Sequence, residues 1–248
     1  AFRLPLIKTQ TSSRFKLFHE LMLNKVQHIL LIGTSYEAWI MEEDCRISEQ
    51  IVNEYRGLNL SRPPRLTWVL SLDEALEQYP QIPFDLVITF SRAVDDNAFD
   101  LGRQIKQAKP AIPVVLLTHQ EALPESVPAW HEQPDALDLV VYWSGQADIL
   151  LAIVKNIEDR YNAVADTRTA GVRVILFIED SPYSLALMLP ILYKQLVVEV
   201  QAVIEEGLNE EHRLLTMRTR PKILLAHSFE RALELYEQFK PYVFGVIS

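Results

Sequence analysis

The sequence of 248 residues contains a single cysteine, Cys45, and only seven glycines. One cysteine excludes an intramolecular disulfide and a cysteine-rich metal cluster. So few glycines leave little room for a glycine-rich phosphate-binding loop. No uncharged apolar run reaches the ~18 residues of a membrane span, and the first residues have no signal-peptide core. This pattern favours a reducing compartment, and we expect a cytoplasmic protein.

Positive charge is also scarce, and the histidines do not cluster. A formal net charge of −9 argues against a nucleic-acid-binding surface. The six histidines have no metal-ligand spacing, and they lie at His19, His28, His119, His131, His212 and His227. Apolar residues make up 49% of the chain, which is enough to build a folded core.

The chain does contain a regular alternation of short apolar runs and stretches with helical periodicity. The runs have no polar alternation, which is typical of parallel strands covered by helices on both faces. The predicted strands are residues 28–33, 65–70, 84–90, 113–118 and 137–142, and the predicted helices are 36–56, 71–79, 97–108 and 146–162. An α/β fold with a parallel sheet follows from this order.

The same unit begins again near residue 173. Residues 71–79 (SLDEALEQY) and 228–236 (SFERALELY) are identical at five of nine positions, and each segment follows an apolar run introduced by proline. A repeat in the same order indicates a duplication. The second copy is predicted to contain strands 173–178, 222–226 and 243–248 and helical stretches 183–206, 208–218 and 229–239.

Four segments follow from this division of the chain. We expect an N-terminal extension with a helix at 13–25, a first domain, a small polar linker and a second, partial domain. Their boundaries are 1–27, 28–162, 163–171 and 172–248.

The two copies differ where their first strand ends. The second copy ends in Glu179 and Asp180, whereas the first ends in Gly33 and Thr34. Ligands of open α/β sheets bind at the carboxyl ends of the strands, and two adjacent carboxylates there suit a hard cation such as Mg²⁺. The alternative is an acidic helix cap, because Asp-Ser-Pro is ordinary chemistry at the start of a helix. Both interpretations stay open.

These features together resemble the receiver domain of bacterial response regulators. The resemblance rests on the strand-Glu-Asp-Ser sequence at 174–181 and on the runs 84–90 and 113–118. It implies a flavodoxin-like three-layer sandwich around a parallel sheet, in two tandem copies of which the second is truncated. In this family an acidic pair holds Mg²⁺, and an aspartate that ends the third strand accepts a phosphoryl group from a sensor histidine kinase. A Thr or Ser ending the fourth strand and a Lys ending the fifth respond to the modification.

The first copy departs from this pattern at nearly every position. The acceptor position falls on Phe90, the acidic pair is replaced by Gly33 and Thr34, and the lysine position falls near Trp143. Only the switch position, Thr118, is kept. We therefore expect a pseudo-receiver that retains the fold without phosphoryl chemistry.

The second copy keeps Glu179 and Asp180 as the expected Mg²⁺ ligands of an intact receiver. Aligned with one inserted residue, its acceptor aspartate is expected just after Ser248 and outside the chain. Without the insertion the acceptor position would be Ser248 itself. We favour the first alignment, so no catalytic residue is expected within the sequence.

A wider resemblance suggests what such a module regulates. Residues 35–44 and 212–226 look like parts of the N-terminal regulatory region of large bacterial proteins related to phosphoenolpyruvate synthase. The resemblance implies a non-enzymatic signalling fragment. Its implied partners are a sensor kinase or other phosphodonor and its own output module, and the resemblance also allows a homodimer. The alternatives are an interaction scaffold that is never phosphorylated and a small α/β enzyme.

Overall fold

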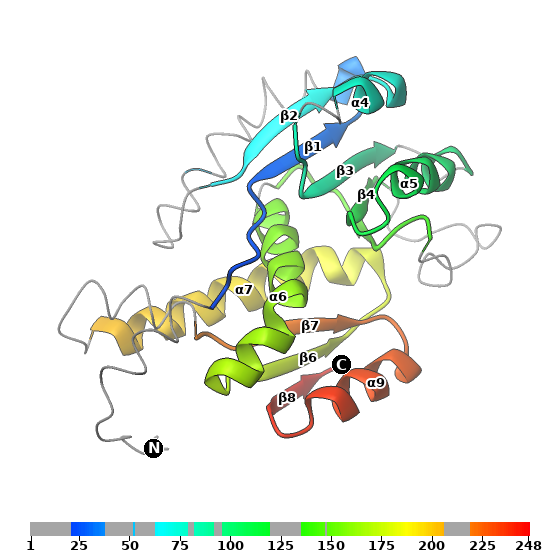
Figure 1. Cartoon of the computed structure of the whole chain (residues 1–248). Helices are drawn as coiled ribbons and strands as arrows, with labels where there is room; N and C mark the ends of the chain where they lie inside the picture. The colour runs from blue at the N-terminus through cyan, green and yellow to red at the C-terminus, as the bar shows by residue number, and fades with distance from the viewer. Residues whose placement is uncertain are drawn as a thin grey trace.

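The structure is a computed structural model that describes residues 21–37, 52, 63–78, 82–91, 96–119, 135–146, 148–205 and 219–248. It contains two parallel β-sheets with helices packed around them (Figure 1). The predicted helices at 36–56 and 208–218 lie mostly or wholly outside the described residues, as does Cys45.

The first sheet has five parallel strands in the order β2-β1-β3-β4-β5. This is the strand order of flavodoxin-like folds, so the predicted fold class is confirmed. The strands are β1 (His28–Ile32), β2 (Arg65–Val69), β3 (Leu86–Ser91), β4 (Val114–Thr118) and β5 (Leu139–Tyr142). The described helices of this part are α4 (Leu72–Gln78) and α5 (Asp96–Ala108). We call this sheet with α4 and α5 the first lobe.

The second sheet has three parallel strands in the order β7-β6-β8, which matches β2-β1-β3 of the first sheet. Its elements are β6 (Val174–Ile178), α7 (Pro182–Glu205), β7 (Lys222–Ala226), α9 (Phe229–Phe239) and β8 (Val243–Ile247). We call these elements the second lobe. Among the described helices, none is long and apolar enough to cross a membrane.

The sequence repeat has the same local structure in both lobes. Ser71 accepts a hydrogen bond at its Oγ from the N–H of Glu74 (3.2 Å), and Ser228 accepts one from the N–H of Arg231 (3.1 Å). Each serine thereby satisfies an otherwise unpaired donor in the first turn of a helix. The matched nonapeptides therefore start α4 and α9 by the same device.

The predicted linker at 163–171 is wrong, because residues 163–170 belong to one helix, α6 (Asp148–Ala170). Ala163, Asp166 and Thr167 are buried on this helix. The predicted helix at 13–25 is also wrong over residues 21–25, which are not helical, and Met22 has a φ of 54°. Both errors have one cause, because the polar face of α6 packs against this N-terminal segment.

Three polar side chains on α6 bind the backbone of residues 22–26. Each contact joins a carboxylate or amide oxygen to a main-chain N–H. The bonds are Met22 N–H to Asp166 Oδ1 (3.2 Å), Asn24 N–H to Asn162 Oδ1 (3.0 Å) and Val26 N–H to Glu158 Oε1 (3.2 Å). Four residues of an α-helix rise about 6 Å and two residues of an extended chain about 6.6 Å, so the two spacings match. The side chains of α6 therefore accept hydrogen bonds from the backbone of this segment, as the carbonyl groups of a neighbouring strand would.

The adjacent face of α6 binds the edge of the second sheet in the same way. Strand β7 is an edge strand of the second sheet. The N–H of Lys222 donates to the carbonyl oxygen of Arg173, on the side of β6 (2.8 Å). Ile223 faces α6: its N–H donates to Asp159 Oδ2 (3.0 Å) and its carbonyl accepts from Asn156 Nδ2 (3.2 Å). An open strand edge is a site for unwanted pairing, and α6 covers part of this one.

A buried group of charges surrounds this contact. Asp159, which is fully buried, forms a two-pronged ion pair with Arg220 (2.7 and 2.8 Å) and accepts a hydrogen bond from Tyr193 Oη (2.9 Å). Lys222 Nζ lies 2.9 Å from Asp166 Oδ2. Burial raises the pKa of Tyr193 well above its ordinary value and lowers the pKa of Lys222. Two carboxylates thus balance two cations inside the protein.

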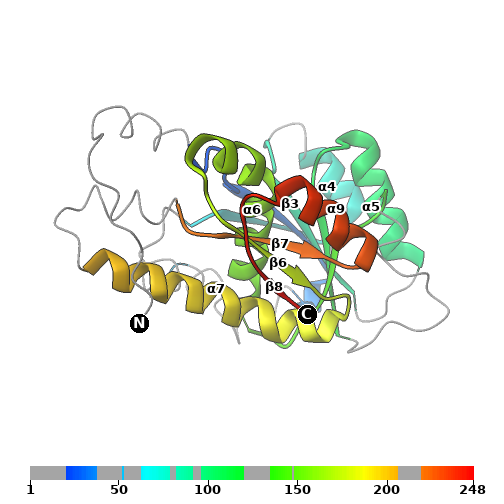
Figure 2. The same cartoon turned by 90° about the horizontal axis from the view of Figure 1, so that it is seen from below.

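One apolar core runs through both lobes. It includes the buried residues of the first sheet and of α6, and it continues into the second lobe through Phe177, Leu185, Leu189 and Ile223. Helix α6 lies between the two sheets (Figure 1). Helix α7, the long helix along the lower side of Figure 2, contacts both α6 and β5. A second, smaller cluster joins α9 to β6 and β7.

We expect Asp159→Asn to lower the free energy of unfolding by about 3–5 kcal/mol, because it leaves the buried guanidinium of Arg220 without its charge partner. Urea denaturation of both proteins measures the difference. The matched control is Asp100→Asn, which removes an exposed ion pair with Arg103 and should cost about 0–1 kcal/mol. Equal costs for the two substitutions would contradict the importance of the buried pair.

Candidate functional site

Aromatic rings fill the carboxyl-terminal edge of the first sheet, where flavodoxin-like folds bind ligands. Phe90 stacks on Trp68 with ring centroids 5.4 Å apart, and its other neighbour is Trp143 at 5.8 Å in an edge-to-face arrangement. Phe90 and Trp143 are 7% and 5% exposed. The position that the resemblance assigns to a phosphoryl acceptor is therefore part of a packed apolar cluster.

The packing around this cluster leaves little room for a side chain at Gly33. A Cβ atom at this position would lie 2.9 Å from the Trp68 ring and 2.8 Å from Glu37 Oε2. A larger residue would have to displace an aromatic side chain that is itself packed, and a carboxylate here would lie beside that of Glu37. The packing of Trp68 and the position of Glu37 therefore both favour glycine at position 33.

Glu37 is a buried carboxylate at this edge that the sequence analysis did not select. Its Oε2 accepts a hydrogen bond from the N–H of Thr34 (2.7 Å), while Thr34 Oγ1 lies 3.4 Å from the N–H of Glu37. This reciprocal arrangement is a capping box at the start of the helical residues 35–37. The Thr-x-x-Glu spacing was visible in the sequence, and it assigns Glu37 to helix capping.

Thr118, the expected switch position, is the last residue of β4 and is fully buried. It pairs with Ser91 on one side and Tyr142 on the other. Its carbonyl accepts a hydrogen bond from the N–H of Trp143 (2.7 Å). Thr118 therefore lies level with the aromatic cluster, and its backbone helps to position Trp143.

The acidic pair lies at the matching edge of the second sheet. Glu179 Oε1 accepts hydrogen bonds from the N–H groups of Asp180 (3.1 Å) and Ser181 (2.9 Å), whereas Asp180 is exposed. Ser181 then caps α7, because its Oγ accepts from the N–H of Ser184 (3.3 Å). His227 Nδ1 lies 3.2 Å from the carbonyl oxygen of Glu179, so this nitrogen must carry the proton. Glu179 is thus bound to the backbone that leads into α7.

The carboxylates of this edge do not by themselves fit a magnesium site. Within the described part of the chain, no group of three or more His, Cys, Asp or Glu side chains converges as metal ligands would. One oxygen of Glu179 already binds two N–H groups. Mg²⁺ requires near-octahedral oxygen coordination, and two neighbouring carboxylates supply only part of it.

The strand registers show which residues of the two sheets are equivalent. Ile32 pairs with Thr89, which brings Gly33 level with Phe90. In the second sheet Phe177 pairs with Ile247, and a register shift beside Val174 takes up one additional residue of β8. Ser248 therefore comes level with Ile178, as Thr89 does with Ile32.

No family model matches this chain, and no curated protein matches its sequence. Among solved structures, a pilus assembly-related protein from Burkholderia pseudomallei is similar at 12% identity over 54% of this chain and 90% of that chain, with a TM-score of 0.39. A LuxR-family two-component response regulator from Aurantimonas is similar at 14% identity over 54% and 86%, with a TM-score of 0.39. The BeF3-activated receiver domain of DrrB is similar at 20% identity over 53% and 97%, with a TM-score of 0.35. These similarities cover about half of the chain and assign no family.

Proposed function

We propose that this chain is a regulatory module of the response-regulator type whose first lobe cannot accept a phosphoryl group. The observation that carries the proposal is the packing of Phe90 between Trp68 and Trp143. Phosphoryl transfer needs a positioned nucleophile and a metal or cationic clamp. The first lobe has a phenyl ring at the acceptor position and Gly33 at the acidic position, so its role is to contact other proteins or domains.

For the second lobe we propose the chemistry that the first has lost. Glu179 and Asp180 would provide part of a Mg²⁺ site, and the acceptor aspartate would follow Ser248. The strand registers support this alignment, since they make Ser248 equivalent to Thr89 rather than to Phe90. The chain would then act in tandem-receiver regulation of a phosphoenolpyruvate-synthase-like output module. Its partners would be a sensor histidine kinase or other phosphodonor, with a homodimer possible, in the cytoplasm.

One observation favours the simpler alternative, an interaction scaffold in which neither lobe is phosphorylated. Both hydrogen bonds to Glu179 Oε1 come from the backbone at the entry to α7. A carboxylate in this position stabilises the start of a helix without any metal. The two functions differ in whether Asp180 is needed for magnesium-dependent phosphorylation.

Incubation with acetyl phosphate and Mg²⁺ should leave the first lobe unmodified, because the acceptor position holds the buried phenyl ring of Phe90. Intact mass followed by peptide mapping under mild conditions measures the incorporation. The Asp180→Asn variant is the control for any phosphoryl group found in the second lobe. A phosphoryl group on a peptide from residues 28–146 would contradict the proposal for the first lobe.

We expect Phe90→Asp to destabilise the protein by about 3–5 kcal/mol, the usual cost of removing a buried phenyl ring. Phe90→Leu retains an apolar side chain and should cost less than about 1.5 kcal/mol. Urea denaturation followed by tryptophan fluorescence measures both values. Neither variant should gain phosphorylation, because Gly33 and Thr34 provide no carboxylate to hold a metal ion. Efficient phosphorylation of the Phe90→Asp variant would show that this edge of the first sheet still supports phosphoryl transfer, and it would contradict the proposal.

A further inference from the structure

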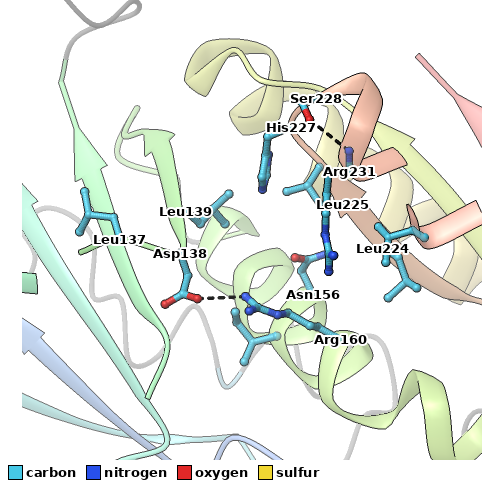
Figure 3. Close-up of a pocket in the computed structure, with 12 residues that line it drawn as sticks. Leu137, Asp138, Leu139, Asn156, Arg160, Leu224, Leu225, His227, Ser228 and Arg231 are labelled. Atoms are coloured by element: carbon cyan, nitrogen blue, oxygen red, sulfur yellow. Dashed lines mark hydrogen bonds and ion pairs between the residues drawn. The ribbon is translucent and has the colours of Figure 1, made fainter. Parts of the chain in front are cut away.

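A cavity of about 360 Å³ lies between the two lobes. Its walls come from the segment that leads into β5, from α6, from β7 and from the start of α9 (Figure 3). One wall is aliphatic and is formed by Leu137, Leu139, Ile157, Leu224, Leu225 and Leu235. The volume is in the range of small-molecule sites, which combine an apolar lining with a few polar groups.

The polar side of the cavity is cationic, although the chain as a whole is acidic. Arg160 and Arg231 line it together with His227, and a single carboxylate, Asp138, is among the lining residues (Figure 3). Asp138 pairs with Arg160 through Oδ1 (3.0 Å) and with Lys106 through Oδ2 (2.9 Å). Asp138 thus shares its one negative charge between Arg160 and Lys106. The positive charge of Arg160 is only partly balanced and can attract an anionic ligand.

Within the described part of the chain, Arg231 forms its ion pair with an exposed residue, Glu234. Its Nη1 lies 2.7 Å from Glu234 Oε2, and both side chains are more than half exposed. An exposed ion pair between residues three apart on a helix contributes little to stability. An anion that enters the cavity can therefore replace Glu234 as the partner of Arg231 at a small cost in free energy.

Ser228 is the N-cap of α9 and Arg231 lies in its first turn, where the helix dipole favours negative charge. Ser228 Oγ already accepts the N–H of Arg231, so the guanidinium groups are the main donors for an anion. Peptide groups alternate in direction along a strand, so those of Leu225 face the same side as those of Ile223, toward α6. Guanidinium groups, a helix start and a strand edge thus meet beside an aliphatic wall.

We propose that this cavity binds a small organic phosphate. The phosphate group would lie between Arg160 and Arg231, and its apolar body would pack on the leucine side chains. Two guanidinium groups match the charge of a phosphate monoester and bind its oxygens in a planar, two-pronged geometry. This proposal is independent of the phosphoryl chemistry proposed for the sheet edges.

Such a ligand would contact both lobes at once. Asp138 and Arg160 belong to the side of β5 and α6, whereas Arg231 and Ser228 belong to α9. Binding would therefore stabilise the arrangement of the second lobe against α6. This makes the cavity a place where a metabolite concentration can influence a regulatory module.

Isothermal titration calorimetry with phenyl phosphate at about pH 8, where a phosphate monoester carries close to two negative charges, tests the proposal on the full chain. We expect one saturable site that binds phenyl phosphate more tightly than inorganic phosphate, which lacks the apolar body, or phenol, which lacks the charge. Absence of binding, or equal binding of inorganic phosphate, would overturn the proposal.

Substitutions then locate the site. Arg231→Gln and Arg160→Gln should each weaken phenyl phosphate binding by about tenfold, the usual effect of losing one charged hydrogen bond. The matched control is Arg103→Gln, because Arg103 also forms an exposed pair with a residue three positions away, Asp100. If the Arg160→Gln variant does not fold, the binding measured for the Arg231→Gln variant is the test of the site. Binding that survives Arg231→Gln unchanged would place the ligand elsewhere and overturn the proposal.

Discussion

The rest of the structure depends on the way helix α6 hydrogen-bonds to two extended segments with its side chains. One face binds the N–H groups of residues 22–26 through Glu158, Asn162 and Asp166. The adjacent face binds both peptide groups of Ile223 through Asp159 and Asn156. Buried polar groups are costly unless they are hydrogen-bonded. These buried side chains of α6 have their hydrogen-bond partners when both extended segments are in place. The two lobes are therefore expected to fold as one unit.

The carboxyl-terminal edges of the two sheets carry different side chains. In the first lobe an aromatic cluster around Phe90 fills this edge, and Glu37 caps a helix. In the second lobe Glu179 and Asp180 keep their carboxylates, although Glu179 also caps the entry to α7. The cavity between the lobes lies beside the same helix that joins them. The cavity and the hydrogen bonds from α6 to β7 therefore both lie where the two lobes meet.

Much of the fold was predictable because its strands are buried on both faces and read as uninterrupted apolar runs. The parallel α/β class followed from the alternation with helices, and the flavodoxin-like fold followed from the resemblance to receiver domains. Strand β7 and helix α9 have the predicted bounds. The linker at 163–171 was mispredicted because its polar residues look like a surface segment. The buried Asp166 of this segment accepts a hydrogen bond from Met22, 144 positions earlier in the chain, and no local pattern reveals such pairing.

The candidate site was predictable to a smaller extent. Phe90, Gly33 and Thr118 were selected from their positions at strand ends, and the alternative interpretation of Glu179 as a helix cap agrees with its hydrogen bonds. The contact of Phe90 with Trp68 depends on the register of β1, β2 and β3, and its contact with Trp143 depends on the register of β3, β4 and β5. Register is set by tertiary packing, so the aromatic cluster and the interlobe cavity appeared only in the structure.

The most direct test of the account is native-state hydrogen exchange on the unmodified chain at increasing urea concentration. The shared helix and continuous core predict that the slowest amides of β4 in the first lobe and of β7 in the second open with the same free energy and the same urea dependence. A second lobe that opens at a clearly lower free energy while β4 stays protected would contradict a single cooperative unit.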